Sequence, residues 1–313
     1  MTATKFLVTG CAGFIGGHML ERLAADNIPT VGVDNLSTGK RENMAGAGKA
    51  FEFIEGDLCD PAVAARAVRG VTHVIHLASV PSVPRSVANP LESHHSSATS
   101  TVTLLEAAQK AGVKRVVQAA SSAAYGDNET LPQSEDLPPR PLSPYAAAKL
   151  AQEHYGRAFA ASMGLDTVAF RYFNVFGPRQ DPTSEYSAVI PKFITLMLAG
   201  KQPTIFGDGG QSRDFIYVEN VVEANFRAAL HPAPLRGETI NLACGSRTDL
   251  NTLVAKLNAI LGTDLAAIHA APRAGEVRHS VADIGKVKRI LGYVPAVDFD
   301  EGLRRTVESF RPA

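Results

Sequence analysis

Short apolar runs alternate with amphipathic stretches over the first half of the chain. The runs have the length of buried strands, and they lie at 5–9, 30–33, 51–54, 71–77, 114–120 and 166–170. The stretches between them carry apolar residues at helical spacing, as Ile15, Met19 and Leu23 do after the first run. Such alternation predicts an α/β fold, a doubly wound Rossmann-type parallel sheet with right-handed crossover helices.

The regular alternation ends near residue 175. We therefore predict two domains, a Rossmann-type domain over 1–174 and a smaller C-terminal α/β lobe over 175–313. The strand-like run 213–218 and the helix pattern after it make up the segment 213–232. We expect this segment to return to the sheet of the first domain.

The composition limits the classes of protein that the chain fits. Its 313 residues are 45% apolar and 20% charged, and Lys plus Arg equal Asp plus Glu at 31 each. This balance gives no general attraction to nucleic acid or to an anionic membrane, and the sequence has no run of 18 or more apolar residues that would predict a membrane span. Cys11, Cys59 and Cys244 are too widely spaced for a disulfide framework, which favours the reducing cytoplasm.

Glycines follow the first strand directly and open the first helix. Gly10, Gly13 and Gly16 allow a sharp turn and a close approach of the backbone to a pyrophosphate, while the helix N-terminus offers N–H groups and a positive dipole. Phe14 and Ile15 lie within this turn. A tight turn of purely structural purpose is the alternative, but strand, glycine turn and helix in this order are typical of a dinucleotide site.

Asp34 ends the second strand, about 20 residues beyond the glycines. Its carboxylate suits the ribose hydroxyls of adenosine and would repel a 2′-phosphate, so NAD is predicted as the cofactor rather than NADP. The turns after the neighbouring strands add further cofactor candidates, because ligands bind at the carboxyl ends of the strands in such a sheet. These candidates are Asn35, Ser37, Asp57, Leu58, Leu77, Ala78 and Ser79.

Ser143 and Pro144 open a predicted helix in which Lys149 comes four residues after Tyr145. Tyr145 and Lys149 therefore share a helical face, and an ammonium beside a phenol is expected to lower the tyrosine pKa from about 10. This makes Tyr145 a candidate general base for an alcohol. Ser121, at the end of a strand, is placed to donate to the same substrate oxygen. The alternatives are a surface Tyr–Lys pair and a helix-capping serine.

With these motifs, the chain resembles the extended short-chain dehydrogenase/reductase family over essentially its whole length, and most closely its UDP-hexose 4-epimerases of the UDP-N-acetylglucosamine group. The motifs that carry the resemblance are the glycine turn, Ser121 with Tyr145 and Lys149, and the segments 82–86, 171–182, 212–215 and 275–280. The resemblance implies NAD as the cofactor, with Tyr172 among its contacts. Family members usually have an asparagine where Ser97 stands, so Ser97 is a candidate cofactor contact that departs from the family pattern.

The resemblance also implies roles for residues around a UDP-sugar. These residues are Ser82, Ser122 and Ser280 at the hexose, Asn174, Arg213 and Arg273 at the phosphates, and Val189, Ile190 and Glu276 at the uridine. Arginines spread along loops are more often solvated, so the assignment of Arg213 and Arg273 depends on the resemblance. His94 and His95 lack carboxylate or cysteine partners at ligand spacing, and no metal is expected.

The family reaction implied for this chain begins with oxidation of the sugar at C4, with Tyr145 as base and Ser121 at the developing oxygen. Related dehydratases and decarboxylases have a carboxylate beside this serine, whereas Ser122 and Ala123 stand here. The 4-keto sugar is therefore expected to accept hydride on its other face, which is 4-epimerisation. The room left by Ser280 admits UDP-GlcNAc and UDP-GalNAc as the predicted pair, with UDP-Glc and UDP-Gal as a further pair.

Other functions remain compatible with these residues. One is another C4-oxidising nucleotide-sugar enzyme, such as a UDP-glucuronate 4-epimerase or a dTDP-hexose reductase or dehydratase. Others are a net oxidoreductase that releases its cofactor and a non-catalytic dinucleotide sensor, although such sensors often lose the catalytic tyrosine. The helices expected at 91–111 and 145–162 are rich in small residues, and the resemblance implies that they form a homodimer interface.

Overall fold

The computed structural model describes residues 4–182, 188–272 and 277–311. Contacts within the chain divide it into two compact units. The first comprises Met1–Gly126, Pro138–Tyr172 and Val222–Ile240, and the second comprises Asp127–Leu137, Phe173–Val221 and Asn241–Ala313. The chain therefore passes from one unit to the other repeatedly.

The first unit is built on a seven-stranded sheet in the order β3-β2-β1-β4-β5-β6-β11. The strands are β1 (Phe6–Thr9), β2 (Thr30–Asp34), β3 (Phe51–Glu55), β4 (His73–His76), β5 (Arg115–Ser121), β6 (Asp166–Tyr172) and β11 (Glu238–Leu242). Every pair from β3 across to β6 is parallel, and Val8 of β1 lies opposite Gly32 of β2 and Ile75 of β4. The predicted doubly wound sheet is confirmed, with its change of winding direction between β1 and β4.

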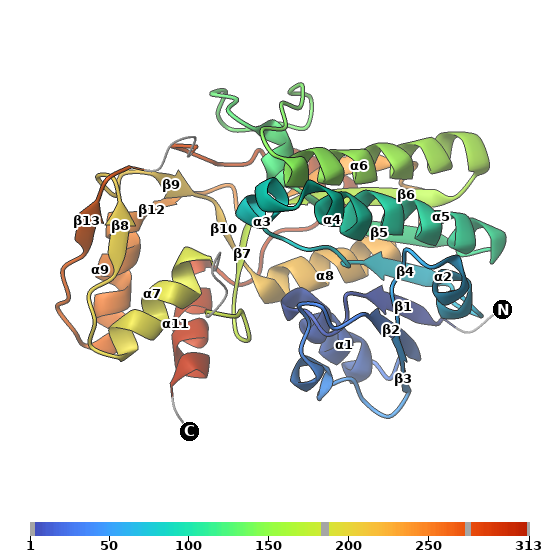
Figure 1. Cartoon of the computed structure of the whole chain (residues 1–313), viewed down its shortest axis with the longest axis horizontal. Helices are drawn as coiled ribbons and strands as arrows, with labels where there is room; N and C mark the ends of the chain where they lie inside the picture. Colours follow the sequence, from blue (N-terminus) through green and yellow to red (C-terminus); the bar gives the residue numbers. More distant parts are fainter. Residues whose placement is uncertain (1–3, 183–187, 273–276, 312–313) are drawn as a thin grey trace. The chain divides into compact units, whose positions relative to one another are not determined.

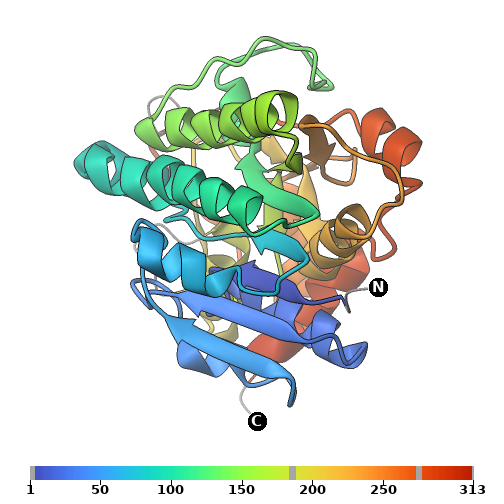
Figure 2. The same ribbon diagram turned by 90° about the vertical axis from the view of Figure 1, so that its right-hand side faces the viewer.

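Helices cover both faces of this sheet. On one face lie α1 (Phe14–Ala25) and residues 222–229 of α8 (Val218–Ala229), and on the other lie α2 (Pro61–Ala67), α5 (Ser100–Lys110) and α6 (Pro144–Met163) (Figure 1). Figure 2 shows α2, α5 and α6, in blue, teal and green, side by side on their face. Buried aliphatic side chains fill the space between the layers, among them Leu7, Val31, Val74, Leu104 and Val116. Such strands are buried on both faces, which explains their nearly continuous apolar runs.

Helix α6 begins as its sequence predicts. The Ser143 hydroxyl accepts a hydrogen bond from the Ala146 N–H at 3.1 Å, and Pro144 occupies the first turn. The helix ends at Gly164, whose φ of 71° is the left-handed conformation that glycine adopts without steric cost. The N-cap fixes the position of Tyr145, because the tyrosine is the second residue of the helix.

The helix expected at 91–111 is interrupted. It consists of α4 (Pro90–His94), a π-helical turn (His95–Thr99) and α5, and the Ser100 N–H reaches the His95 carbonyl five residues back. Hydroxyl groups take part in the interruption, because Ser100 Oγ donates to Ser96 O at 2.8 Å and Thr101 Oγ1 to Ser97 O at 2.6 Å. Serine and threonine side chains compete for helical carbonyls in this way, and π-helical turns often lie at functional sites.

The second unit is built from pairs of short strands and separate helices (Figure 1). The strand pairs are β7 (Asn174–Phe176) with β10 (Phe215–Tyr217), β8 (Thr204–Phe206) with β13 (Ile268–Ala270), and β9 (Ser212–Arg213) with β12 (Thr248–Asp249). The helices are α7 (Val189–Leu198), α9 (Leu250–Leu261), α10 (Gly285–Leu291) and α11 (Phe299–Phe310). An aromatic cluster around Phe176 contains Phe215, Tyr217 and Phe299, and Gly302 of α11 makes room for it, because a Cβ there would lie 2.9 Å from the Tyr217 ring.

The strand expected at 213–218 forms, but it does not join the large sheet. β10 pairs in parallel with β7, and the strand that extends the large sheet beside β6 is β11. The expectation that the segment 213–232 returns to the sheet is therefore wrong for its strand, whereas residues 222–232 belong to the first unit. The pairing of β10 with β7 joins residues some 40 positions apart, and no local pattern selects that partner over β6. In the parts of the chain that the structure describes, no helix combines the length and the apolar character needed to cross a bilayer.

Candidate active site

The glycine turn has the geometry of a dinucleotide cradle. Gly10 has a φ of 65°, and a Cβ there would lie 2.9 Å from the backbone nitrogen of Ala78. A Cβ on Gly16 would lie 2.1 Å from the Gly10 carbonyl oxygen, while one on Gly13 would lie 3.1 Å from it. The N–H groups of Phe14 and Ile15 belong to the first turn of α1, where a helix offers no internal acceptor. The turn therefore fits a pyrophosphate, with space that only glycine leaves and N–H groups for its oxygens.

Asp34 is held rigidly at the end of β2. Its Oδ2 accepts from the Ala12 N–H at 3.0 Å and its Oδ1 from the Leu36 N–H at 2.8 Å. Burial raises the pKa of Asp34 above its ordinary value, and these two backbone hydrogen bonds oppose the rise. Gly39 lies against the same carboxylate, since a Cβ there would be 2.9 Å from Oδ1. The carboxylate thus stands beside the glycine turn, as the contact expected for an adenosine ribose requires.

The other residues predicted to contact the adenosine follow the neighbouring strands β2 and β3. Asn35 Nδ2 donates to Asp57 Oδ2 at 3.3 Å, and the Ser37 N–H donates to Asn35 Oδ1 at 3.1 Å. Burial alone would raise the pKa of Asp57, but hydrogen bonds from Cys59 and Asn35 bring it below its ordinary value. Leu58 is buried beside them. Asp57 is therefore an ionised acceptor that these bonds orient.

The residues that follow β4 are hydrogen-bonded to β1 and to the π-helical turn. The N–H groups of Leu77 and Ala78 both donate to Thr9 Oγ1 at 3.1 Å. Ser79 Oγ lies 2.8 Å from Ser97 Oγ, and Ser97 is fully buried in the π-helical turn. Tyr172, a further cofactor candidate at the end of β6, is linked to helix α8 by its hydroxyl, which donates to Asn225 Oδ1 at 2.8 Å.

Ser121 and Tyr145 are brought into contact. Ser121 is the last residue of β5, and its side chain hydrogen-bonds with Tyr145 and accepts from the Ala123 N–H at 3.2 Å. Lys149 lies one turn further along α6 and is buried, with Nζ donating to Ala119 O at 2.7 Å and to Gln152 Oε1 at 3.2 Å. A phenol bonded to a serine hydroxyl, with an amine one helical turn away, can take up and return the proton of a substrate alcohol.

The pKa of Tyr145 departs from its usual value in the direction opposite to the one expected. It is raised above 10.0, because burial disfavours the phenolate more than the hydrogen bond with Ser121 favours it. Burial also lowers the pKa of Lys149 from 10.5 to about 7, against the attraction of Glu153. The expected lowering of the Tyr145 pKa is therefore wrong for this geometry, because spacing along a helix reveals a nearby charge and does not reveal the desolvation of both groups.

Two of the residues predicted to contact the hexose, Ser82 and Ser122, belong to the first unit and lie at the start of local helical turns there. Ser82 caps helix α3 (Val83–Ala88) by accepting from the Arg85 N–H at 3.1 Å, and Ser122 opens the 3-10 turn Ser122–Tyr125. Both serines are partly buried. The turn after Ser121 contains Ala123 and Ala124 and no carboxylate.

Several predicted substrate residues belong to the second unit, and three of them are connected there. Asn174 donates its N–H to Asp214 O at 3.1 Å, next to Arg213, and the Ser280 N–H donates to Ser212 O at 3.1 Å. Val189 and Ile190 form the start of α7. Arg273 and Glu276 lie outside the described residues.

Sequence reasoning missed Asp214, which organises this part of the second unit. Its buried carboxylate accepts from the N–H groups of Cys244, Gly245 and Ala282 at 2.9, 3.0 and 3.1 Å. Burial raises the pKa of Asp214 to about 6, and the three hydrogen bonds oppose the rise. A charged residue directly before the apolar run 215–218 was the only sequence signal. Over residues 4–182, 188–272 and 277–311, no group of three or more His, Cys, Asp and Glu side chains could hold a metal ion.

Comparisons with known proteins show what the chain is similar to. A model of the NAD dependent epimerase/dehydratase family matches residues 6–243. A UDP-glucose 4-epimerase of Mycolicibacterium smegmatis is 39% identical over 314 residues, covering 98% of each chain. The structure of a UDP-N-acetylglucosamine 4-epimerase from Methanobrevibacter ruminantium in complex with UDP-N-acetylmuramic acid superposes with a TM-score of 0.94 at 40% identity, covering 99% of each chain. A Thermus thermophilus UDP-glucose 4-epimerase in complex with NAD gives a TM-score of 0.89 at 38% identity, covering 99% of this chain and all of the other.

Proposed function

The chain belongs to the NAD-dependent epimerase/dehydratase family, and from this premise we propose that it is a 4-epimerase of UDP-sugars that interconverts UDP-GlcNAc and UDP-GalNAc. The observation that carries the proposal is the contact of Ser121 with Tyr145 at the end of β5, with the buried Lys149 one helical turn away. The glycine turn and the fixed carboxylate of Asp34 fit NAD, the cofactor of the family.

Each residue of the trio has a separate task in the proposed mechanism. Tyr145 takes the proton of the C4 hydroxyl and later returns it, while Ser121 holds the same oxygen by a hydrogen bond. The charge of protonated Lys149 favours the phenolate form of Tyr145, the form that can take a proton. The chemistry that NAD supplies when bound is reversible hydride transfer. Tyr145 is partly buried, and its raised pKa keeps the phenol protonated at neutral pH. The phenolate that acts as the base is therefore expected to increase with pH, and activity with it, only while Lys149, whose pKa is about 7, keeps its charge.

The turn after Ser121 favours epimerisation over elimination. Ser122, Ala123, Ala124 and Tyr125 form this turn, and it contains no carboxylate. Tyr125 is fully buried, with Arg171 over its ring, so its phenol is not exposed to a sugar. A dehydratase needs an additional acid and base close to the sugar. With Tyr145 and Ser121 as the groups at C4, the available course is loss and return of hydrogen at that carbon.

The preference for acetamido sugars depends on Ser280. The likeness to a UDP-N-acetylglucosamine 4-epimerase supports this preference, while the similar UDP-glucose 4-epimerases support UDP-Glc and UDP-Gal as a further pair. Ser280 is small and partly buried, and its N–H is held by Ser212 O. We propose that this small side chain leaves the room that a 2-acetamido group needs.

Incubation of the purified protein with UDP-GlcNAc and, separately, with UDP-Glc tests the proposal. The reactions contain no added reductant, and proton NMR follows the sugar signals while absorbance follows NADH. Conversion to the galacto isomers without net NADH supports 4-epimerisation, and the two rates measure the acetamido preference. Net NADH formation or a requirement for added NADH would instead indicate a dehydrogenase or reductase. Protein that binds NAD and converts neither sugar would contradict the proposed pair, and UDP-glucuronate and dTDP-hexoses would be tested next.

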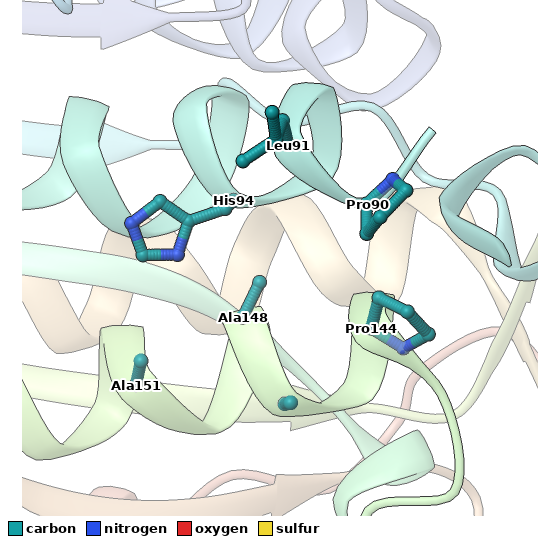
Figure 3. Close-up of a pocket in the computed structure, with 7 residues that line it drawn as sticks. Pro90, Leu91, His94, Pro144, Ala148 and Ala151 are labelled. Atoms are coloured by element: carbon teal, nitrogen blue, oxygen red, sulfur yellow. The ribbon is translucent and has the colours of Figure 1, made fainter. Parts of the chain in front are cut away.

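We also propose a homodimer in which α4 and α6 face a second copy. Their surface carries an apolar pocket of about 360 Å³, lined by Pro90, Leu91, His94, Pro144, Ala147, Ala148 and Ala151 (Figure 3). Leu91 is 70% exposed, and burial of such a side chain in a dimer would contribute about 2 kcal/mol. Light scattering is expected to give twice the mass of one chain, and Leu91→Glu to shift it toward the monomer. A monomeric wild type would contradict this proposal.

A reducing compartment suits the cysteines of the chain. Cys11, Cys59 and Cys244 are all free thiols. Burial raises the pKa of Cys59 and of Cys244 to about 12, and nearby carboxylates add to the rise, so neither is a reactive thiolate at neutral pH. We propose the cytoplasm as the site of action.

A further inference from the structure

His76 has no part in the mechanism above, although it is a fully buried polar residue at the end of β4. Both of its ring nitrogens are within hydrogen-bond distance of a hydroxyl. Nδ1 lies 2.8 Å from Thr9 Oγ1 at the end of β1, and Nε2 lies 2.9 Å from Thr101 Oγ1 in α5. Buried polar groups need such partners, and here the partners come from two different elements: β1, which leads into the glycine turn, and α5, which follows the π-helical turn.

The hydrogen bonds around Thr9 determine which ring nitrogen carries the proton. Thr9 Oγ1 already accepts from the N–H groups of Leu77 and Ala78, at 3.1 Å each. Because these two bonds occupy both lone pairs of the oxygen, the hydroxyl can only donate its own proton to His76, and the acceptor atom is Nδ1. A neutral imidazole that accepts at Nδ1 carries its proton at Nε2, which then donates to Thr101 Oγ1. Burial and the nearby charge of Lys149 lower the pKa of His76 to about 3, which keeps the ring neutral.

The chain of hydrogen bonds continues into the π-helical turn. The Thr101 hydroxyl accepts from His76, and it donates to Ser97 O at 2.6 Å. The side chain of Ser97 lies 2.8 Å from Ser79 Oγ. Thr9 donates to His76, His76 donates to Thr101, and Thr101 donates to the Ser97 carbonyl. Because each group donates to the next, the other tautomer of His76 would break the hydrogen bonds to both Thr9 and Thr101.

Both ends of this chain of hydrogen bonds lie at the cofactor cradle. At one end, Thr9 holds the backbone of Leu77 and Ala78, and Ala78 is the residue against which Gly10 packs without a side chain. At the other end, the Ser97 side chain is paired with Ser79, and Ser97 is the position at which the family resemblance implies an asparagine. Displacement of the imidazole would loosen both sides of the cradle at once.

We propose that His76, held as its neutral Nε2–H tautomer, is a positioning residue for NAD that couples the glycine turn to the π-helical turn carrying Ser97. The proposal does not depend on the identity of the sugar, because it concerns the cofactor that the family uses.

Variants of Thr101 test the coupling without removing the ring. Thr101→Val keeps nearly the shape of the side chain but leaves the His76 Nε2–H without an acceptor, while Thr101→Ser keeps the hydroxyl. We expect Thr101→Val to weaken NAD+ binding about tenfold, as measured by the dissociation constant of the full chain, and Thr101→Ser to remain within about twofold of the wild type.

His73 provides a matched control on the same strand. It is also buried, bonds to Thr72 Oγ1 at 2.9 Å and stacks on Phe6, but it lies at the opposite end of β4 from the cradle. We expect His73→Asn to lower the unfolding temperature with an unchanged dissociation constant for NAD+. His76→Asn should lower the unfolding temperature and weaken NAD+ binding.

The tautomer of His76 is tested by a separate NMR experiment. In the wild type, ¹⁵N NMR of the imidazole should give a protonated Nε2 and an unprotonated Nδ1 between about pH 5 and pH 8. A ring protonated at Nδ1 would overturn the proposal. Unchanged NAD+ binding in Thr101→Val, with only a lower unfolding temperature, would do the same, because the network would then be merely structural. Should His76→Asn fail to fold, the Thr101 pair and the NMR measurement still decide.

Discussion

Arg171 of β6 and Glu153 of α6 form a bidentate ion pair. Arg171 Nε donates to Glu153 Oε1 at 3.0 Å and Nη2 donates to Oε2 at 2.8 Å, with both side chains nearly inaccessible to solvent. Burial disfavours the charge on Arg171, but Glu153 raises the pKa of the guanidinium above its ordinary value. Glu153 also raises the pKa of Lys149 against the effect of burial. One carboxylate thus supports two buried cations.

Removal of that carboxylate is expected to destabilise the first unit strongly. Glu153→Gln leaves the Arg171 guanidinium buried without a counter-charge, which costs about 3–5 kcal/mol. Urea unfolding measures this loss. Glu106→Gln is the control, because Glu106 pairs with Lys110 on the surface of α5 and its loss should cost little. A loss for Glu153→Gln as small as that of the control would contradict the assigned role of the buried pair.

Replacement of the proposed base should separate catalysis from cofactor binding. Tyr145→Phe keeps the ring but removes the proton carrier, and we expect kcat to fall by about 10²–10⁴ or more. NAD+ binding, measured by titration, should stay unchanged. Ser121→Ala should lower kcat less, since it removes one hydrogen bond to the same oxygen. A fully active Tyr145→Phe protein would exclude Tyr145 as the base.

Two alanine substitutions in the glycine turn should differ in severity. Gly16→Ala places a methyl group 2.1 Å from the Gly10 carbonyl oxygen, a distance that forces the backbone to move. Gly13→Ala meets the same oxygen at 3.1 Å, where a small shift suffices. We expect NAD+ binding to be lost in Gly16→Ala and weakened only moderately in Gly13→Ala. Equal affinities in the two variants would show that backbone position in the turn does not control binding.

Enlargement of residue 280 tests the substrate preference. Ser280→Tyr should lower kcat/KM for UDP-GlcNAc by far more than for UDP-Glc, because a tyrosine would occupy the room proposed for the 2-acetamido group. We expect a difference of about tenfold or more between the two substrates, a size typical for loss of space in a binding pocket. Equal losses for both sugars would remove Ser280 from the specificity argument.

The lowered pKa of Lys149 predicts a specific pH dependence of stability. The pKa is about 7 in the folded chain, against 10.5 for an ordinary lysine, so between these values the unfolded chain binds the additional proton. The wild type should therefore gain stability as the pH rises from 7 toward 10, by up to about 1.4 kcal/mol per pH unit from this group. Lys149→Met should lack that contribution. Parallel stability curves for the two proteins over this range would contradict the assigned pKa.

Features that depend on short stretches of sequence could be predicted. The strands β1 to β6, the glycine turn, and the N-cap Ser143 with Tyr145 behind it all lie where local pattern and turn chemistry place them. The contact of Ser121 with Tyr145 followed from a rule about parallel sheets, namely that the strand ends share one edge.

Features decided by distant partners could not be predicted. β11 has a mixed polar and apolar sequence and becomes the seventh strand only through its pairing with β6, while β9 and β12 are two residues long and have no periodicity. The π-helical turn arises from hydroxyl groups that bind carbonyls within an otherwise regular pattern. The burial of Tyr145 and Lys149, which shifts their pKa values, depends on the packing of α6 against the distant strands β5 and β6.

The repeated passage of the chain between its two units has a consequence for biosynthesis. The first unit requires Val222–Ile240, and its sheet includes β11, which ends at Leu242 of the 313 residues. A ribosome must therefore release most of the chain before that sheet can close. Until then, the β6 edge of the growing sheet is without its neighbour, and an unpaired edge invites contact with other chains. For the same reason, neither unit can be expressed alone as one continuous fragment.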